Sequence, residues 1–181
     1  MLGVVLAGGA SRRMGREKAL VEIAGRPMIG WVTSALETVC DRIEIAGQIG
    51  GRRGLADPPG IRGPLAGLRA GLALGEDLLL VAVDQPWLRP GTLQKLANLE
   101  GTVVPIEDEV RQVTCARYGA DLAPVAAAAA SLQELLDRVT FVAIEDTEWR
   151  SWGEDGRSWY SVDDEEALNE GLRRFGPPVL A

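Results

Sequence analysis

The chain has 181 residues, a length that suits one compact domain with a full hydrophobic core. Its 19 basic and 26 acidic side chains give a formal charge of −7, which argues against bulk attraction to nucleic acid or to an anionic membrane. The chain has no histidine, and its two cysteines, Cys40 and Cys115, stand alone. This composition excludes Ser-His-Asp triads, histidine metal clusters and a paired redox motif.

The apolar start of the chain is interpreted as a first strand rather than a targeting segment. The stretch MLGVVLAGG has no positively charged n-region and soon breaks into glycine and arginine. No apolar run approaches the roughly 18 residues that a bilayer-spanning helix needs. We therefore expect a cytoplasmic protein with neither a membrane nor a nucleic acid as partner.

Apolar runs of strand length alternate with helical patterns, which favours a parallel sheet covered by helices. Strands are expected at residues 3–7, 42–47, 77–84, 102–105, 140–144 and 159–162, with an antiparallel or edge strand at 111–118. Helices are expected from Pro27, Pro64 and Pro90, because proline is favoured in a first helical turn. The 17 residues 47–63, rich in glycine and proline, are expected to form a long loop.

The C-terminal third is expected to be helical and aromatic. The alanine-rich run 123–139 reads as helix, and Ser131 with Glu134 forms a capping box that indicates a helix start. Residues 163–175 place acids first and bases last, as suits a helix dipole. An aromatic cluster near this end is interpreted as core packing rather than as a stacking platform; it comprises Trp149, Trp152, Trp159 and Tyr160.

A glycine pair and a basic cluster follow the first strand. Gly8 and Gly9 lack a Cβ, which would let the backbone curl around an anion and direct its N–H groups at it. The stretch 12–18 then holds four bases, Arg12, Arg13, Arg16 and Lys18, against the single acid Glu17. The spacing matches neither a Walker loop nor a Rossmann glycine pattern. We interpret it as a polyphosphate cradle rather than as a solvated basic turn.

Asp84 ends an apolar strand in the motif VAVDQP, at the carboxyl edge where open α/β sheets bind ligands. Gly8 and Asp84 should therefore reach the same crevice. A carboxylate there can hold Mg²⁺, which takes one or two protein carboxylates together with phosphate oxygens. The alternative is an exposed aspartate that caps the following turn.

Four motifs together resemble the MobA-type molybdenum cofactor guanylyltransferases of the nucleotidyltransferase superfamily: LAGGASRRMGREK (6–18), GPLAGL (63–68), VAVDQP (81–86) and WYSVDDEEAL (159–168). The resemblance covers nearly the whole chain. It implies one nucleotidyltransferase domain over residues 1–181, with an α/β fold: a single-domain Rossmann-like three-layer sandwich whose mostly parallel sheet has one antiparallel strand. It also implies transfer of GMP from GTP to molybdopterin with release of pyrophosphate, Mg²⁺ as cofactor, and transient contact with molybdoenzyme clients or cofactor-insertion proteins.

The same resemblance implies roles for individual residues. Nucleotide binding would involve Leu6, Ala7, Gly8, Gly9, Ser11, Arg12, Lys18, Asp57, Gly63 and Asp84. Catalysis would fall to Lys18, Arg13 and Asp84, which offset phosphate charge directly or through the metal. Asp84 would be a magnesium ligand, and Asp163 is either a second ligand or the N-cap of the last helix.

The chain departs from the family pattern mainly where the second substrate would bind. Just after the second strand, where the family often has asparagine, Gln48 is the only polar candidate for a nucleoside contact. Residues 112–114 replace a Gln-Pro-Leu pattern of the family. Three alternatives stay open: a cytidylyltransferase relative, a sugar-phosphate or phospholactate nucleotidyltransferase, and a non-catalytic carrier of nucleotide or cofactor. The Gly8–Gly9 pair favours guanine, because cytidylyl relatives usually have two alanines there.

Overall fold

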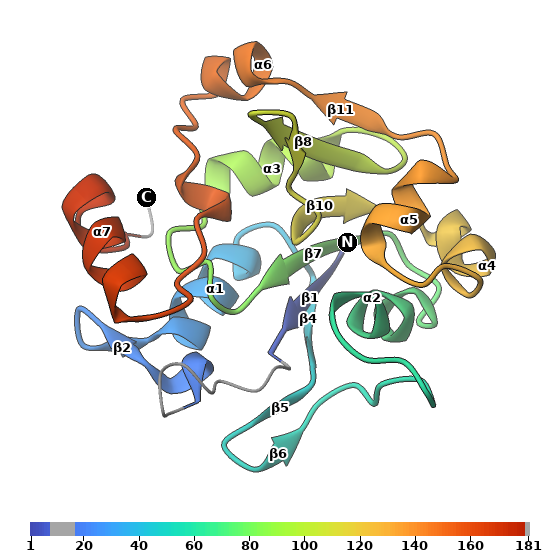
Figure 1. Cartoon of the computed structure of the whole chain (residues 1–181), viewed down its shortest axis with the longest axis horizontal. Helices are drawn as coiled ribbons and strands as arrows, with labels where there is room; N and C mark the ends of the chain where they lie inside the picture. Colours follow the sequence, from blue (N-terminus) through green and yellow to red (C-terminus); the bar gives the residue numbers. More distant parts are fainter. Residues whose placement is uncertain (8–16, 180–181) are drawn as a thin grey trace.

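A computed structural model describes residues 1–7 and 17–179 of the chain. Its central sheet has the strand order β11-β8-β10-β7-β1-β4, and helices lie on both faces (Figure 1). The central strands are β1 (Leu2–Leu6), β4 (Arg42–Ala46), β7 (Leu78–Ala82), β8 (Val103–Glu107), β10 (Cys115–Tyr118) and β11 (Val142–Ile144). The helices are α1 (Met28–Glu37), α2 (Pro64–Leu72), α3 (Pro90–Asn98), α4 (Ala123–Ala126), α5 (Leu132–Asp137), α6 (Asp146–Ser151) and α7 (Glu165–Phe175).

The smaller elements are η1 (Lys18–Leu20), η2 (Ala120–Leu122) and η3 (Arg157–Trp159), the hairpin of β2 (Glu22–Ile23) and β3 (Arg26–Pro27), the hairpin of β5 (Gln48–Ile49) and β6 (Arg52–Arg53), and β9 (Val110–Arg111). β1 pairs in parallel with β4 and β7, and β8 in parallel with β11. β10 lies antiparallel between β7 and β8, and β9 adds a short antiparallel pairing to β8. The expected mostly parallel sheet with an antiparallel strand is confirmed.

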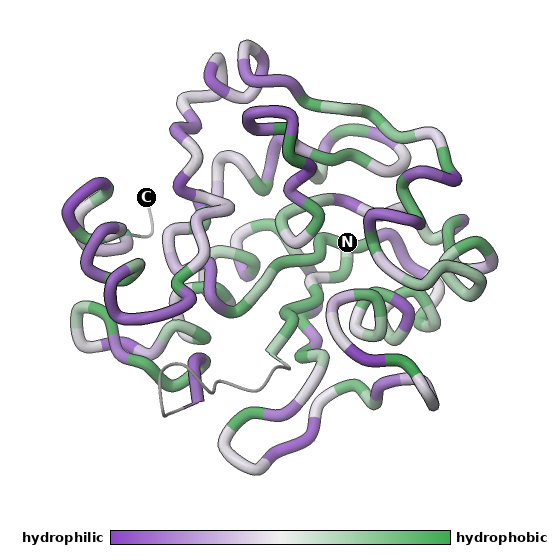
Figure 2. Tube along the Cα trace, viewed as in Figure 1, coloured by the Kyte–Doolittle hydropathy of each residue, from purple (hydrophilic) through white to green (hydrophobic). Residues whose placement is uncertain are grey.

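Alternation along β7 divides the interior between the two faces of the sheet. Leu78 and Leu80 pack with α2, α4 and α5, whereas Leu79 and Val81 pack with α1, α3 and α6. The residues of β1 and β7 are hydrophobic through the centre of the molecule (Figure 2). Because both faces of these strands are buried, their sequences are continuous apolar runs, and the expected three-layer sandwich is confirmed.

Two expectations, for residues 47–63 and 111–118, need correction. The segment 47–63 is not one loop, because β5 and β6 form a hairpin around Gly50 and Gly51, whose φ angles are 56° and 78°. Left-handed backbone at both central positions suits a two-residue hairpin turn, and glycine adopts it without strain. The expected strand 111–118 is also broken: β9 ends at Arg111, and Gln112 N donates to Pro105 O before β10 begins.

The alanine-rich run holds two helices, as its capping box indicates, but residues 127–131 between them are not helical. α4 ends at Ala126, and α5 starts after Ser131, whose side chain accepts from Glu134 N at 3.1 Å. Alanines offer little surface for packing. Where the helix ends, Arg69 donates hydrogen bonds to the backbone carbonyl groups, with its Nε 2.6 Å from Ala126 O. The capping-box expectation is thus confirmed.

Residues 159–162 do not form a strand. The buried carboxylate of Glu154 accepts from the backbone N–H groups of Asp155 and Gly156 at 2.9 Å, which holds a turn that leads into η3. Trp159 then packs edge-to-face on Trp149, with ring centroids 5.2 Å apart. These tertiary contacts override the local strand preference of the aromatic residues. Both tryptophans are buried in the core, as expected.

Within residues 1–7 and 17–179, no helix is both long and apolar enough to cross a bilayer.

Candidate functional site

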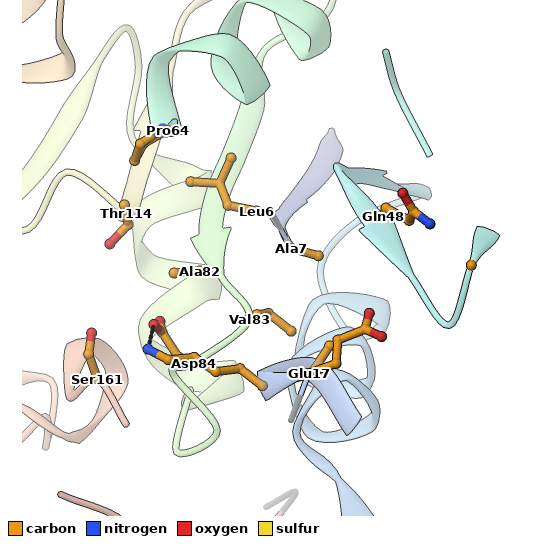
Figure 3. Close-up of a pocket in the computed structure, with 13 residues that line it drawn as sticks. Leu6, Ala7, Glu17, Gln48, Pro64, Ala82, Val83, Asp84, Thr114 and Ser161 are labelled. Atoms are coloured by element: carbon orange, nitrogen blue, oxygen red, sulfur yellow. Dashed lines mark hydrogen bonds and ion pairs between the residues drawn. The ribbon is translucent and has the colours of Figure 1, made fainter. Parts of the chain in front are cut away.

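A pocket of about 530 Å³ lies at the carboxyl ends of β1 and β7 (Figure 3). The parallel register pairs Leu6 with Ala82, and Val83 N donates to Leu6 O at 3.0 Å just beyond the strands. Ala7, the last described residue before the glycine pair, and Asp84 therefore line the same pocket. The crevice expected at this edge of the sheet is present.

Lys18 joins two carboxylates that come from distant parts of the chain. Its Nζ lies 3.1 Å from Asp84 Oδ2, at the end of β7, and 2.7 Å from Asp163 Oδ1, just before α7. The side chains of Lys18 and Asp84 are 19% and 20% exposed, so this contact is partly shielded from water. Burial by itself lowers the pKa of Lys18, but the hydrogen bond to Asp163 and the charge of Asp84 together raise it. Lys18 is thus a charged ammonium at neutral pH.

The start of α7 excludes one of the two roles considered for Asp163. Asp164 is the residue that caps this helix, because its Oδ1 accepts from Ala167 N at 2.9 Å. The helix-cap alternative for Asp163 is therefore wrong, and its carboxylate turns to Lys18 instead. The segment is fixed to the sheet by Val162 N, which donates to Asp84 O at 2.8 Å.

The chemistry of Asp84 fits a divalent cation with oxygen ligands. Its Oδ1 is buried and has no hydrogen-bond partner among residues 1–7 and 17–179. A buried acceptor without a partner costs about 1–3 kcal/mol, which a ligand at that atom would offset. No three acidic, cysteine or histidine side chains gather as a metal site in the described part of the chain. A single carboxylate, or two, is nevertheless what Mg²⁺ takes beside phosphate oxygens.

The glutamine of the VAVDQP motif makes hydrogen bonds with two residues that line the pocket. Gln85 is buried, its Oε1 accepts from Ala82 N at 3.0 Å, and its Nε2 donates to Thr114 Oγ1 at 3.2 Å. Thr114 and Ser161 lie on one side of Asp84 in the view of the pocket, and Gln48 and Glu17 lie on the other (Figure 3). Polar side chains therefore line the pocket on both sides of Asp84.

Helix α2 approaches the pocket closely because Gly67 has no side chain. A Cβ at this position would overlap the side chain of Leu6 and lie 2.9 Å from Ala46 Cβ. Pro64, at the first position of the same helix, lines the pocket. The GPLAGL motif therefore brings a helix start to the edge of the sheet.

The predicted site residues are only partly brought together. Leu6, Ala7, Lys18 and Asp84 line the pocket. Asp163 contacts Lys18, whereas Asp57 and Gly63 are exposed on the segment before α2, and none of these three is among the described lining residues. The remaining predicted residues, Gly8, Gly9, Ser11, Arg12 and Arg13, lie outside the part of the chain that the structure describes.

One lining residue was missed by the sequence analysis. Glu17 received no role, yet both oxygens of its carboxylate accept from Gly50 N, at 3.0 and 3.2 Å. Its only sequence signal is that it is the one acid in a stretch of four bases.

Comparisons with known proteins agree with this geometry. A family model described as a MobA-like NTP transferase domain matches residues 3–147. The molybdenum cofactor guanylyltransferase of Rhodobacter capsulatus is 44% identical over 108 residues, which are 52% of this chain and 56% of that protein. A probable molybdenum cofactor guanylyltransferase of Pelotomaculum thermopropionicum is 36% identical over 131 residues, or 68% and 60%. The matched part of the chain thus spans 56–60% of the length of these two relatives.

The fold also has a close solved counterpart. The crystal structure of molybdopterin-guanine dinucleotide biosynthesis protein A from Archaeoglobus fulgidus superposes with a TM-score of 0.80, over 96% of this chain and 98% of that one. Its sequence identity is 20%, so the likeness concerns the fold alone.

Proposed function

This chain belongs to the MobA-like NTP transferase family, and we propose that it transfers GMP from GTP to molybdopterin, forming molybdopterin guanine dinucleotide and releasing pyrophosphate. Residues 1–181 would act as one nucleotidyltransferase domain in the cytoplasm. The names of the two curated relatives support the choice of substrates. The observation that carries the proposal is the ammonium of Lys18, which lines the pocket beside Asp84 and also contacts Asp163.

The reaction needs alignment and charge compensation rather than a covalent nucleophile. A terminal phosphate oxygen of molybdopterin attacks the α-phosphorus of GTP in line, the bond to the β-phosphate oxygen breaks, and pyrophosphate leaves. Negative charge accumulates on the leaving group and on the equatorial oxygens. The ammonium of Lys18 lies where it can exchange its carboxylate partners for phosphate oxygens.

Asp84 and Asp163 are the residues that would hold a divalent cation, which we propose to be Mg²⁺. When bound, the ion would offset the charge of the triphosphate and of the leaving pyrophosphate. The buried, unpartnered Oδ1 of Asp84 supports this assignment. Asp163 is more exposed, at 59% of its side chain, and we assign it the weaker contribution.

The nucleotide is proposed to enter with its phosphates at the end of β1. Backbone groups of Leu6, Ala7 and Gly8 would contact it, helped by Gly9, Ser11 and Arg12, and Arg13 would share charge compensation with Lys18. Asp57 and Gly63 stay proposed nucleoside contacts that would have to reach the ligand from the exposed segment before α2. Molybdoenzymes or cofactor-insertion proteins would then receive the product transiently.

Nucleotide choice tests the proposal. Pyrophosphate release is measured with Mg²⁺ and molybdopterin in the presence of GTP, CTP, ATP or UTP in turn, with a control that omits molybdopterin. We expect release with GTP alone, and only when molybdopterin is present. Release confined to CTP would assign the chain to a cytidylyltransferase activity instead. Nucleotide binding without release from any of the four would favour a carrier.

A further inference from the structure

The hairpin of β5 and β6 forms one wall of the pocket and is attached mainly at its base. Gln48 and Gly51 line the pocket. Among the described strands, β5 and β6 pair only with each other. At the base, Gly54 N donates to Gly47 O at 2.9 Å and Leu55 N donates to Ile45 O at 2.7 Å. Beyond that base, Ile49 packs partly against the core. A further contact is made at the tip of the hairpin.

Glu17 supplies that contact. Gly50 N, at the turn of the hairpin, donates to both carboxylate oxygens of Glu17, at 3.0 and 3.2 Å. A hydrogen bond to an ionised acceptor is about twice as strong as a neutral one. Gly50 and Gly51 are the two central residues of this turn, and both have left-handed backbone.

The position of Glu17 in the chain gives this contact a consequence for the site. Glu17 directly precedes Lys18, whose ammonium contacts Asp84 in the pocket and also Asp163. The hairpin wall is therefore tied to the same short segment that places the ammonium. A carboxylate near a triphosphate repels it, so Glu17 would weaken nucleotide binding unless it also had a favourable effect. Fixing the β5–β6 hairpin is such an effect.

We propose that Glu17 is a positioning residue that holds the tip of the β5–β6 hairpin at the wall of the pocket, at a fixed distance from Lys18. This inference rests on the proposed function only in taking the ligand to be a nucleoside triphosphate. We call the hydrogen bonds from Gly50 N to the Glu17 carboxylate the tether. Loss of the tether leaves Lys18, Asp84 and Asp163 in place. It therefore weakens nucleotide binding without slowing the chemical step.

The test compares Glu17→Ala with Glu17→Gln and with Glu22→Ala in the full chain. The amide oxygen of glutamine accepts the same N–H, so Glu17→Gln should keep the tether. Glu22 is an exposed acid on β2 outside the pocket lining, which makes Glu22→Ala a control for loss of one negative charge nearby. Thermal unfolding confirms that each variant is folded.

Two readouts are needed. Amide hydrogen exchange over residues 48–53, without nucleotide, reports the tether itself. Calorimetric titration with GTP and Mg²⁺, together with steady-state kinetics, reports its effect on the site. We expect Glu17→Ala to accelerate exchange and to raise the Kd and KM for GTP about tenfold, with kcat within about twofold of wild type. Glu22→Ala should resemble wild type, and Glu17→Gln, which keeps a neutral acceptor, should lie closer to wild type than Glu17→Ala does.

Unchanged exchange over residues 48–53 in Glu17→Ala would overturn the tether. So would tighter GTP binding in both Glu17 variants, because Glu17 would then act only by repulsion. Failure of the proposed function is a separate result: wild-type protein that binds GTP without turnover, while Glu17→Ala still accelerates exchange, contradicts the transfer reaction and keeps the tether.

Discussion

Lys18→Met is expected to lower kcat/KM for GTP on the order of 10³-fold, because the variant keeps the aliphatic stem and loses the ammonium. Without that charge, the two carboxylates that contact Lys18, Asp84 and Asp163, have no cation supplied by this side chain. The triphosphate would then meet two carboxylates rather than a donor of hydrogen bonds. Steady-state kinetics with GTP and molybdopterin measure the loss.

A matched control for this substitution exists in the chain. Lys95 is the only other lysine, lies exposed on α3 and is not among the described residues that line the pocket. Lys95→Met removes the same charge at a distance from the site and should leave kcat/KM within about twofold of wild type. Turnover by Lys18→Met at the level of Lys95→Met would show that Lys18 has no part in the reaction.

Asp84→Asn is expected to lower kcat about 10²- to 10³-fold and to abolish the response of the rate to Mg²⁺. Asp84 makes two separate contributions: Oδ2 contacts Lys18, and the buried Oδ1 is open to a metal ligand. Asparagine keeps the shape but removes the charge that both contributions require. Titration of the rate with Mg²⁺, and direct binding of Mn²⁺ in the presence of GTP, measure the change.

The loss of activity in Asp84→Asn is compared with the losses in two further variants. Asp163→Asn should cost less, about tenfold, because that carboxylate is 59% exposed and more strongly solvated. Asp108→Asn serves as the control, since Asp108 is exposed in the β8–β9 turn with φ 48°, a conformation that asparagine also accepts. A larger loss in Asp163→Asn than in Asp84→Asn would contradict the assignment of Asp84 as the principal ligand.

The sheet and the floor of the pocket could be predicted because they depend on local patterns. An unbroken apolar run such as Leu78–Val81 indicates a strand buried on both faces, and the carboxyl ends of two parallel strands meet at one edge. Asp84 at the end of such a strand could therefore be placed beside the end of β1. The capping box at Ser131 is equally local.

The hairpin and its tether could not be predicted in the same way. Gly50 and Gly51 carry a hairpin-turn signal, but they lie in a stretch rich in glycine and proline that is typical of a loop. The flanking strands are only two residues long, so no apolar alternation reveals them. Glu17 then meets Gly50 across 33 positions, a pairing that no local pattern indicates.

The end of the chain shows how tertiary contacts override local preference. The aromatic residues at 159–160 favour a strand, yet the buried Glu154 gathers N–H groups into a turn and places Trp159 in the core. The choice between Asp163 and Asp164 depends on where α7 starts, and a shift of one residue exchanges a helix cap for a partner of Lys18.

The most direct test of the central claim follows the α-phosphate of GTP. The 181-residue protein is incubated with molybdopterin, Mg²⁺ and GTP that carries label at either the α- or the γ-phosphate, and the products are separated. We predict that the α-label appears in molybdopterin guanine dinucleotide and the γ-label in pyrophosphate, in equal amounts. Recovery of the α-label only in GMP, or in unchanged GTP bound to the protein, would contradict nucleotidyl transfer.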